Sequence, residues 1–163
     1  MSLKIAMAQI NPVLGDLAGN TAKILAAAQR ARAQGADLLL TPELALCGDS
    51  PEDLLLRQDF YAACDAALET LAAAPEAAGI LLLVGHPLMH EGRRFDAATL
   101  LGEGRRLATC HKRYFPDFSD FHAADAQRYF AAGEGATRNH AADCAADCET
   151  NRATNCASAD DVC

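Results

Sequence analysis

Residues 38–46 read Leu-Leu-Leu-Thr-Pro-Glu-Leu-Ala-Leu, an apolar run that a proline and a glutamate interrupt. The run predicts a buried β-strand over residues 37–41, because short aliphatic segments are typical of core strands and Pro42 cannot continue a strand ladder. Glu43 then follows the strand end, where sheet proteins place functional side chains. We therefore treat Glu43 as a candidate catalytic carboxylate. The alternative is an exposed glutamate in an ordinary turn.

Strand-like and helix-like patterns continue on both sides of this run. We expect further strands over residues 3–10, 80–84, 95–101 and 106–111, and helices over residues 20–35 and 54–75. Asn20 is the expected N-cap of the first helix, and residues 85–87 (Gly-His-Pro) are expected to end the third strand. The first strand is expected to be buried. Helices alternating with strands, followed by a hairpin, indicate an α/β fold with a mixed sheet.

Composition limits the classes of function. The chain has 163 residues, 51% of them hydrophobic, and a formal net charge of −8. The apolar content is sufficient for a core, whereas the negative charge argues against nucleic acid or an anionic membrane surface as a partner. No apolar run is long enough to span a bilayer, and the first residues do not resemble a secretory signal. We therefore expect a soluble, cytoplasmic protein.

The character of the sequence changes near Gly133. Residues 134–163 contain one large aliphatic side chain, Val162, and no aromatic residue. Such a segment cannot bury enough apolar surface to offset the entropy of ordering it. We therefore divide the chain into a folded domain over residues 1–133 and a tail over residues 134–163 that we expect to be disordered.

Five short motifs lie within the first of these regions, at residues 6–12, 41–48, 51–55, 111–113 and 128–130. Together they resemble the N-terminal glutaminase domain of the glutamine-dependent NAD(+) synthetases, a branch of the nitrilase, or carbon–nitrogen hydrolase, superfamily. The motif Pro51 to Leu55 favours this branch over general nitrilases. The resemblance covers about four fifths of the chain. It implies a nitrilase-like α-β-β-α fold of mixed sheets with packed helices, incomplete at the C-terminus.

The resemblance also implies a mechanism and its residues. A thiolate attacks the amide carbonyl, a carboxylate moves the protons, and a cation stabilises the oxyanion. Glu43 would be the base and acid, and Lys112 would stabilise the oxyanion. Taken alone, Lys112 is more simply read as a lysine on a solvated face. Cys148 is the candidate nucleophile, because it lies 36 residues after Lys112 and precedes Glu149. However, the preceding Ala-Ala-Asp lacks the branched aliphatic residues expected of a strand that would hold a nucleophile rigidly.

The seven cysteines fall into two groups. Cys47, Cys64 and Cys110 lie in the folded region, where small apolar thiols usually pack in the core. The others crowd the tail, where together with His140 they invite a metal-binding interpretation: Cys144, Cys148, Cys156 and Cys163. The spacing is poor for a zinc knuckle, so we prefer chance spacing and predict no metal.

Several positions depart from the family pattern. Asp49-Ser50 replace an aromatic residue and a proline, Asp96 stands where an asparagine is usual, and Ala126-Gln127 replace an acidic residue. Two strands and a Cys-Glu-Asp motif should follow Gly133. We interpret their replacement by the tail as truncation or a frameshift after about residue 133. By the same resemblance, ATP and deamido-NAD would bind a synthetase domain that we expect to be absent here, so no cofactor is expected in this domain.

Three functions stay open. The first is hydrolysis of the glutamine amide to supply ammonia for ATP-dependent NAD(+) synthesis, by a Glu-Lys-Cys mechanism that is impaired in this chain. The second is a non-catalytic remnant of the domain that lacks the nucleophile strand. The third is a general carbon–nitrogen amidase acting on another small amide. Expected partners are glutamine, a synthetase domain and further copies of the chain.

Overall fold

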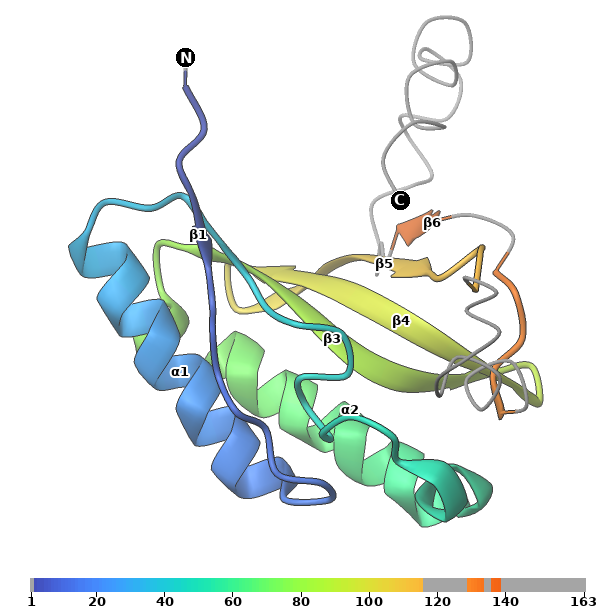
Figure 1. Ribbon diagram of the computed structural model, residues 1–163. Helices are drawn as coiled ribbons and strands as arrows, with labels where there is room; N and C mark the ends of the chain where they lie inside the picture. Colours follow the sequence, from blue (N-terminus) through green and yellow to red (C-terminus); the bar gives the residue numbers. More distant parts are fainter. Residues whose placement is uncertain (1, 116–128, 134–135, 139–163) are drawn as a thin grey trace, which may run out of the picture.

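A single six-stranded sheet forms the centre of the protein, in the order β1-β2-β3-β4-β5-β6. The computed structural model describes residues 2–115, 129–133 and 136–138. β1 and β3 flank β2 in parallel, and the remaining pairs are antiparallel (Figure 1). The mixed α/β architecture is thereby confirmed. The strands are β1 (Ile5–Met7), β2 (Leu38–Leu40), β3 (Leu81–His90), β4 (Arg93–Gly102), β5 (Arg105–His111) and β6 (Ala136–Arg138).

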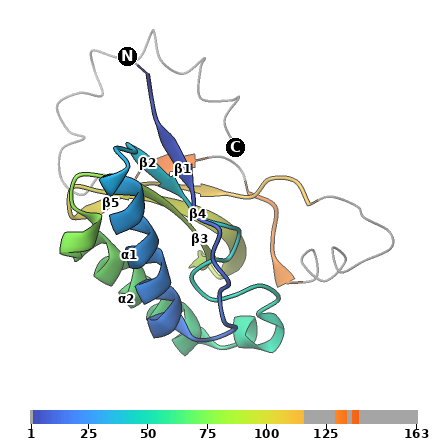
Figure 2. The same ribbon diagram turned by 60° about the vertical axis from the view of Figure 1, so that its left-hand side comes forward.

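Both described α-helices cover the same face of this sheet (Figures 1 and 2). They are α1 (Leu17–Ala33) and α2 (Gln58–Ala73), and the short 3₁₀ segments Glu52–Leu56 and Pro75–Ala77 flank α2. No described helix is long and apolar enough to cross a membrane. The described residues thus form one helical layer and one sheet layer, which is half of the α-β-β-α arrangement that the family resemblance implies.

The core lies between the helices and the sheet. Leu39, Leu82 and Leu101 occupy one row across β2, β3 and β4, and all three are almost completely buried. Leu68 and Leu71 of α2 belong to the same buried cluster. Each such leucine contributes about 1.5–3 kcal/mol through removal of its side chain from water.

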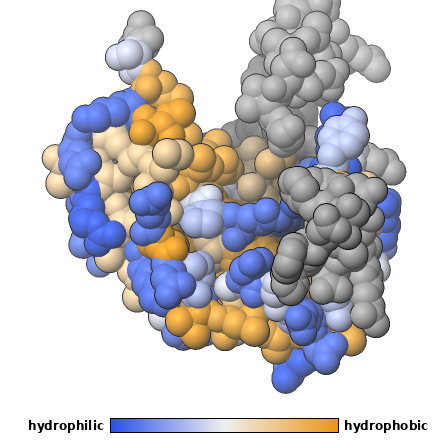
Figure 3. Space-filling view, viewed as in Figure 1, coloured by the Kyte–Doolittle hydropathy of each residue, from blue (hydrophilic) through white to orange (hydrophobic). Residues whose placement is uncertain are grey.

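The prediction of a buried first strand over residues 3–10 is wrong in length and in burial. β1 comprises only Ile5–Met7, and the side chains of Leu3, Ile5 and Met7 are 64%, 53% and 77% exposed. Ile5 is in register with Leu38, and Met7 with Leu40. These residues share the sheet face opposite the helices, which no described helix covers. Figure 3 shows the resulting apolar surface over β1.

Asn20 does not cap α1 as predicted. Asp16 is the N-cap, and its carboxylate accepts a hydrogen bond from the Gly19 amide at 2.9 Å. Asn20 instead lies fully buried inside α1. Its side chain exchanges hydrogen bonds of 2.8 Å with both backbone groups of Val13 and donates to the Leu46 carbonyl at 3.1 Å. Asn20 therefore fastens the loop before α1 to the turn that follows β2.

The third strand does not stop at Gly85-His86-Pro87 as predicted. β3 continues to His90 and pairs with β4 from Leu82 to His90. It pairs with β2 only at Leu81–Leu83, so Pro87 lies where one edge of β3 has no strand partner. The predicted hairpin between β4 and β5 is confirmed, with a register shift at Leu100/Leu101.

Candidate active site

The turn after β2 holds Glu43 against β3. The Gly85 amide donates a hydrogen bond to the Thr41 hydroxyl at 3.1 Å, and the Leu46 amide donates to the Gly85 carbonyl at 3.1 Å. A Cβ atom at position 85 would lie 2.6 Å from the Pro42 carbonyl oxygen. Glycine is therefore required for this close approach. The backbone around Glu43 is fixed on both sides by the neighbouring strand.

Lys112 follows β5 directly and is held by backbone contacts on two sides. Its amide donates a hydrogen bond to the Asp96 carbonyl of β4 at 2.8 Å, and its carbonyl accepts one from the Gly133 amide at 2.9 Å. A side chain at Gly133 would collide with His111, since an added Cβ would lie 2.3 Å from the His111 Cβ. The segment around Gly133 therefore packs closely on the strand end that carries Lys112.

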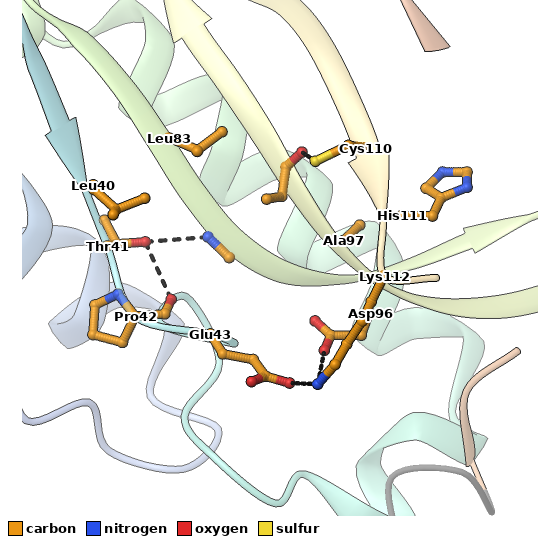
Figure 4. A pocket seen from close by; sticks show the side chains of 12 residues that line it. Leu40, Thr41, Pro42, Glu43, Leu83, Asp96, Ala97, Cys110, His111 and Lys112 are labelled. Carbon is orange, nitrogen blue, oxygen red and sulfur yellow. Dashed lines mark hydrogen bonds and ion pairs between the residues drawn. The ribbon is translucent and has the colours of Figure 1, made fainter. Parts of the chain in front are cut away.

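The fold brings Glu43 and Lys112 together across 69 residues of sequence. The Lys112 Nζ lies 2.6 Å from the Glu43 Oε1 and 3.6 Å from the Asp96 Oδ2 (Figure 4). The Glu43 side chain is 56% exposed, Lys112 is 27% exposed and Asp96 is only 6% exposed. Two carboxyl groups thus share one ammonium group.

These three side chains line a pocket of about 230 Å³ on the open side of the sheet. Its walls include Leu40, Leu83, Ala98 and Cys110. The pocket is therefore mostly apolar, with its polar groups gathered at one end (Figure 4). Such a concave site with a few convergent polar groups is typical of small-molecule binding.

Asp96 is the member of this group that sequence reasoning did not assign to the site. The available signals were its place in an otherwise apolar strand segment and its replacement of the usual asparagine. Burial raises the pKa of Asp96 to about 8, helped by the hydrogen bond and the charge of Glu43. The hydrogen bond from Asp96 is the main cause that lowers the pKa of Glu43, and Lys112 acts in the same direction while burial opposes both.

Lys112 stays positively charged in this setting. Burial alone would lower its pKa, but the hydrogen bonds and charges of Glu43 and Asp96 outweigh burial and raise it. The ammonium group also lies 5.2 Å from the centre of the Phe115 ring. The pocket therefore combines an ionised carboxylate with a cation at contact distance.

Cys148, the candidate nucleophile, lies outside the described residues, as do the tail cysteines and His140 of the metal-binding alternative. Within the described ranges no group of three or more His, Cys, Asp or Glu residues could hold a metal ion.

The predicted packing roles of Cys47 and Cys64 are confirmed, because both thiols are buried free cysteines. Burial raises the pKa of Cys64 to about 12 and that of Cys47 further still. Cys110 differs from the prediction, because it is only half-buried and lines the pocket, with its thiol donating to the Ala98 carbonyl at 3.6 Å.

The sequence and the structure of this chain were each compared with known proteins. The carbon–nitrogen hydrolase family matches residues 4–136. The glutamine-dependent NAD(+) synthetase of Synechocystis is 42% identical over 135 residues, which are 78% of this chain and 24% of that protein. A solved structure of the Acinetobacter baumannii synthetase with ADP superimposes with a TM-score of 0.72 at 32% identity, over 81% of this chain and 24% of that one.

A shorter structural relative is an amidase from Nesterenkonia. It has a TM-score of 0.66 at 29% identity, over 81% of this chain and 48% of the amidase. In one mutant of that amidase an acetamide moiety is covalently added at the active-site cysteine. This chain therefore spans about half of the amidase and about a quarter of the synthetases.

Proposed function

This chain belongs to the carbon–nitrogen hydrolase family, and we propose that its site derives from one that hydrolyses the side-chain amide of glutamine to glutamate and ammonia. The observation that carries the proposal is the 2.6 Å contact between Lys112 and Glu43 at the polar end of an apolar pocket. The similarity to glutamine-dependent NAD(+) synthetases supports glutamine as the amide and NAD(+) synthesis as the use of the ammonia.

In the proposed reaction Glu43 accepts the proton of a cysteine thiol while the sulfur attacks the amide carbon. The oxyanion that forms is stabilised by the Lys112 ammonium group. Glu43 then returns the proton to the amide nitrogen, the C–N bond breaks, and ammonia leaves a thioester behind. Water, deprotonated by Glu43, hydrolyses the thioester and frees the thiol.

The proposed nucleophile of this chain is Cys148. Turnover is proposed to be impaired, because the residues before Cys148 lack the aliphatic character that would hold the thiol rigidly in a strand. The low aliphatic content of residues 134–163 favours the alternative of a non-catalytic remnant that lacks the nucleophile strand. Similarity to the same protein keeps a general small-amide hydrolase as a further alternative.

No cofactor is proposed for this domain. ATP and deamido-NAD would bind a synthetase domain, which would be a partner of this chain and would receive the ammonia. We also propose that the chain is cytoplasmic and that it associates with further copies of itself.

The test is intact-mass analysis after incubation with a diazoketone analogue of glutamine, followed by peptide mapping of any adduct. A single fast adduct on Cys148, lost in Glu43→Gln and Lys112→Ala, is the expected result for a complete catalytic set. The matched control is Cys110→Ala, which removes the thiol that the structure places in the pocket. An adduct that survives Glu43→Gln, or that moves to Cys110, would reflect unassisted alkylation and contradict the proposed mechanism.

A second measurement separates the alternatives. Ammonia release is compared for glutamine and for acetamide at equal concentration. Preference for glutamine supports the glutaminase, preference for acetamide supports the general amidase, and absence of both ammonia and adduct supports the non-catalytic remnant.

A further inference from the structure

The described residues that line the pocket include two carboxyl groups, those of Glu43 and Asp96, but only one ammonium group, that of Lys112. Glu43 and Asp96 both approach Lys112, and no other lysine or arginine lines the pocket among the described residues. The Lys112 Nζ is 1.0 Å nearer to the Glu43 carboxylate (2.6 Å against 3.6 Å). Only the contact with Glu43 is within hydrogen-bonding distance.

The two carboxyl groups also differ in their access to water. The Glu43 side chain is 56% exposed, whereas that of Asp96 is 6% exposed. An ionised carboxylate is far harder to bury than a neutral one unless a close partner neutralises it. Asp96 is therefore the group expected to keep a proton, and its carboxyl group approaches the same ammonium group as that of Glu43.

We propose that Asp96 is a positioning residue, held as a neutral carboxylic acid at neutral pH, which donates a hydrogen bond to Glu43 and keeps that carboxylate ionised beside Lys112. Its meaning for catalysis rests on the proposed function, but its protonation state does not. Asp96 is fixed for this task by β4, where its own carbonyl accepts the Lys112 amide at 2.8 Å. One residue therefore holds Lys112 through its backbone and Glu43 through its side chain.

The neighbouring titratable groups do not supply a second cation. His111 of β5 is paired with Ala97, and its ring stacks on Phe95 at 4.4 Å, on the face of β4 opposite to Asp96. The Cys47 thiol, in the turn after β2, interacts with Asp96, and burial raises its pKa so that it stays neutral. Asp96 thus faces one carboxylate, one ammonium group and one thiol that is neutral at neutral pH.

The arrangement has a defined dependence on pH. Burial raises the pKa of Asp96 to about 8, above its value of 3.8 in an open chain. The folded protein then binds one more proton than the unfolded chain between these values, so this contribution to stability is full at low pH and is lost as the pH rises to about 8. Above that pH two carboxylates compete for Lys112.

The experiment follows the carboxyl groups directly, by NMR of the purified chain with ¹³C-labelled aspartate and glutamate side chains. Asp96→Asn keeps a hydrogen-bond donor that cannot ionise, and Asp96→Leu removes the donor at similar volume. We expect one aspartate resonance to titrate near pH 8 in the parent chain and to be missing from Asp96→Asn. The resonance of Glu43, assigned with Glu43→Gln, should titrate at low pH in the parent and in Asp96→Asn, and at higher pH in Asp96→Leu.

Two results would overturn the proposal. One is an Asp96 resonance that titrates in the ordinary range, below about pH 5. The other is an Asp96→Asn variant in which the Glu43 titration rises as far as in Asp96→Leu. If Asp96→Leu does not fold, the parent and Asp96→Asn still decide the protonation state. Failure of the glutamine analogue to form an adduct would leave these titrations unchanged, so the two proposals fail separately.

Discussion

The two faces of the sheet carry the same residue type in different surroundings. Leu82 points toward the helices and is completely buried, whereas its chain neighbour Leu81 points to the other face and is half-buried. Leu39 and Leu38 of β2 show the same contrast. Whether a leucine of β2 or β3 is buried therefore depends on whether the helices cover its face of the sheet, because leucines occupy both faces. The covered face supplies the stability, and the open face carries the pocket.

The strongest test of this contrast is Leu82→Ala compared with Leu81→Ala. We expect Leu82→Ala to lower the free energy of unfolding by about 2–5 kcal/mol, because it leaves a cavity under α2, and Leu81→Ala to lower it by about 1 kcal/mol. Urea unfolding followed by circular dichroism measures both. Equal losses would show that the second face is also covered.

The covered face should also respond to acid. His86 is buried there, with its Nε2 2.7 Å from the Thr99 hydroxyl and its Nδ1 3.0 Å from the Pro87 carbonyl. Burial lowers its pKa from 6.5 to about 4, so the folded protein binds fewer protons than the unfolded chain between these values. Stability is then full above pH 6.5 and falls by about 3 kcal/mol as the pH drops to 4.

Urea unfolding at a series of pH values checks this dependence, with His86→Gln as the variant that cannot titrate. The free energy of unfolding of His86→Gln should be lower at every pH but should vary less between pH 4 and 6.5. Part of the slope should remain, because burial also lowers the pKa of His111. An unchanged slope would show that His86 is not held neutral.

On the open face the ion pair is expected to contribute little to stability. Glu43→Gln should change the free energy of unfolding by less than about 1 kcal/mol, because Glu43 is more than half exposed and the solvent screens the pair. The same substitution should abolish a zero-length carbodiimide crosslink between Glu43 and Lys112, mapped by mass spectrometry. The crosslink should form in the parent chain, and its absence there would contradict the 2.6 Å contact.

The smallest effect is expected in β1, whose apolar residues are exposed. Ile5→Lys should change the free energy of unfolding by less than about 0.5 kcal/mol, because the side chain is 53% exposed, and should reduce self-association in analytical ultracentrifugation. The matched variant is Ile24→Lys on the buried side of α1, which should prevent folding. A large loss of stability in Ile5→Lys would mean that β1 is covered in solution.

The sequence patterns predicted where most strands and helices lie, but not which residues surround them in the fold. The apolar run before Pro42 and the hairpin around Gly102–Gly104 were predicted in nearly the right places, because periodicity and turn residues are local signals. The extent of β3 was not predicted correctly. Pro87 is tolerated within β3 because the pairing with β2 has already ended at Leu83, which depends on the neighbouring strand. The buried role of Asn20 also depends on its contact with Leu46, which is 26 residues away in sequence, as well as on Val13 in the loop before α1.

The candidate site divides in the same way. Glu43 and Lys112 could be chosen from motifs after strand ends, but their catalytic roles stay predictions. Asp96 was noticed only as a departure from a pattern, since its effect depends on a neutral carboxyl group being enclosed beside a charged one. Cys148 lies outside the described residues, and its role as nucleophile also stays a prediction.

The amino-acid sequence by itself determined the family, the α/β class, the order of the elements and the residue types placed at two strand ends. These follow from the spacing of apolar residues, prolines and glycines along the chain, which is local information. Only the tertiary structure decided which face of the sheet is covered, that Lys112 lies 2.6 Å from Glu43, and that Asp96 is enclosed with them. The physical reason is that burial and the pairing of charges depend on groups far apart in sequence, whose distances the folded sheet alone sets.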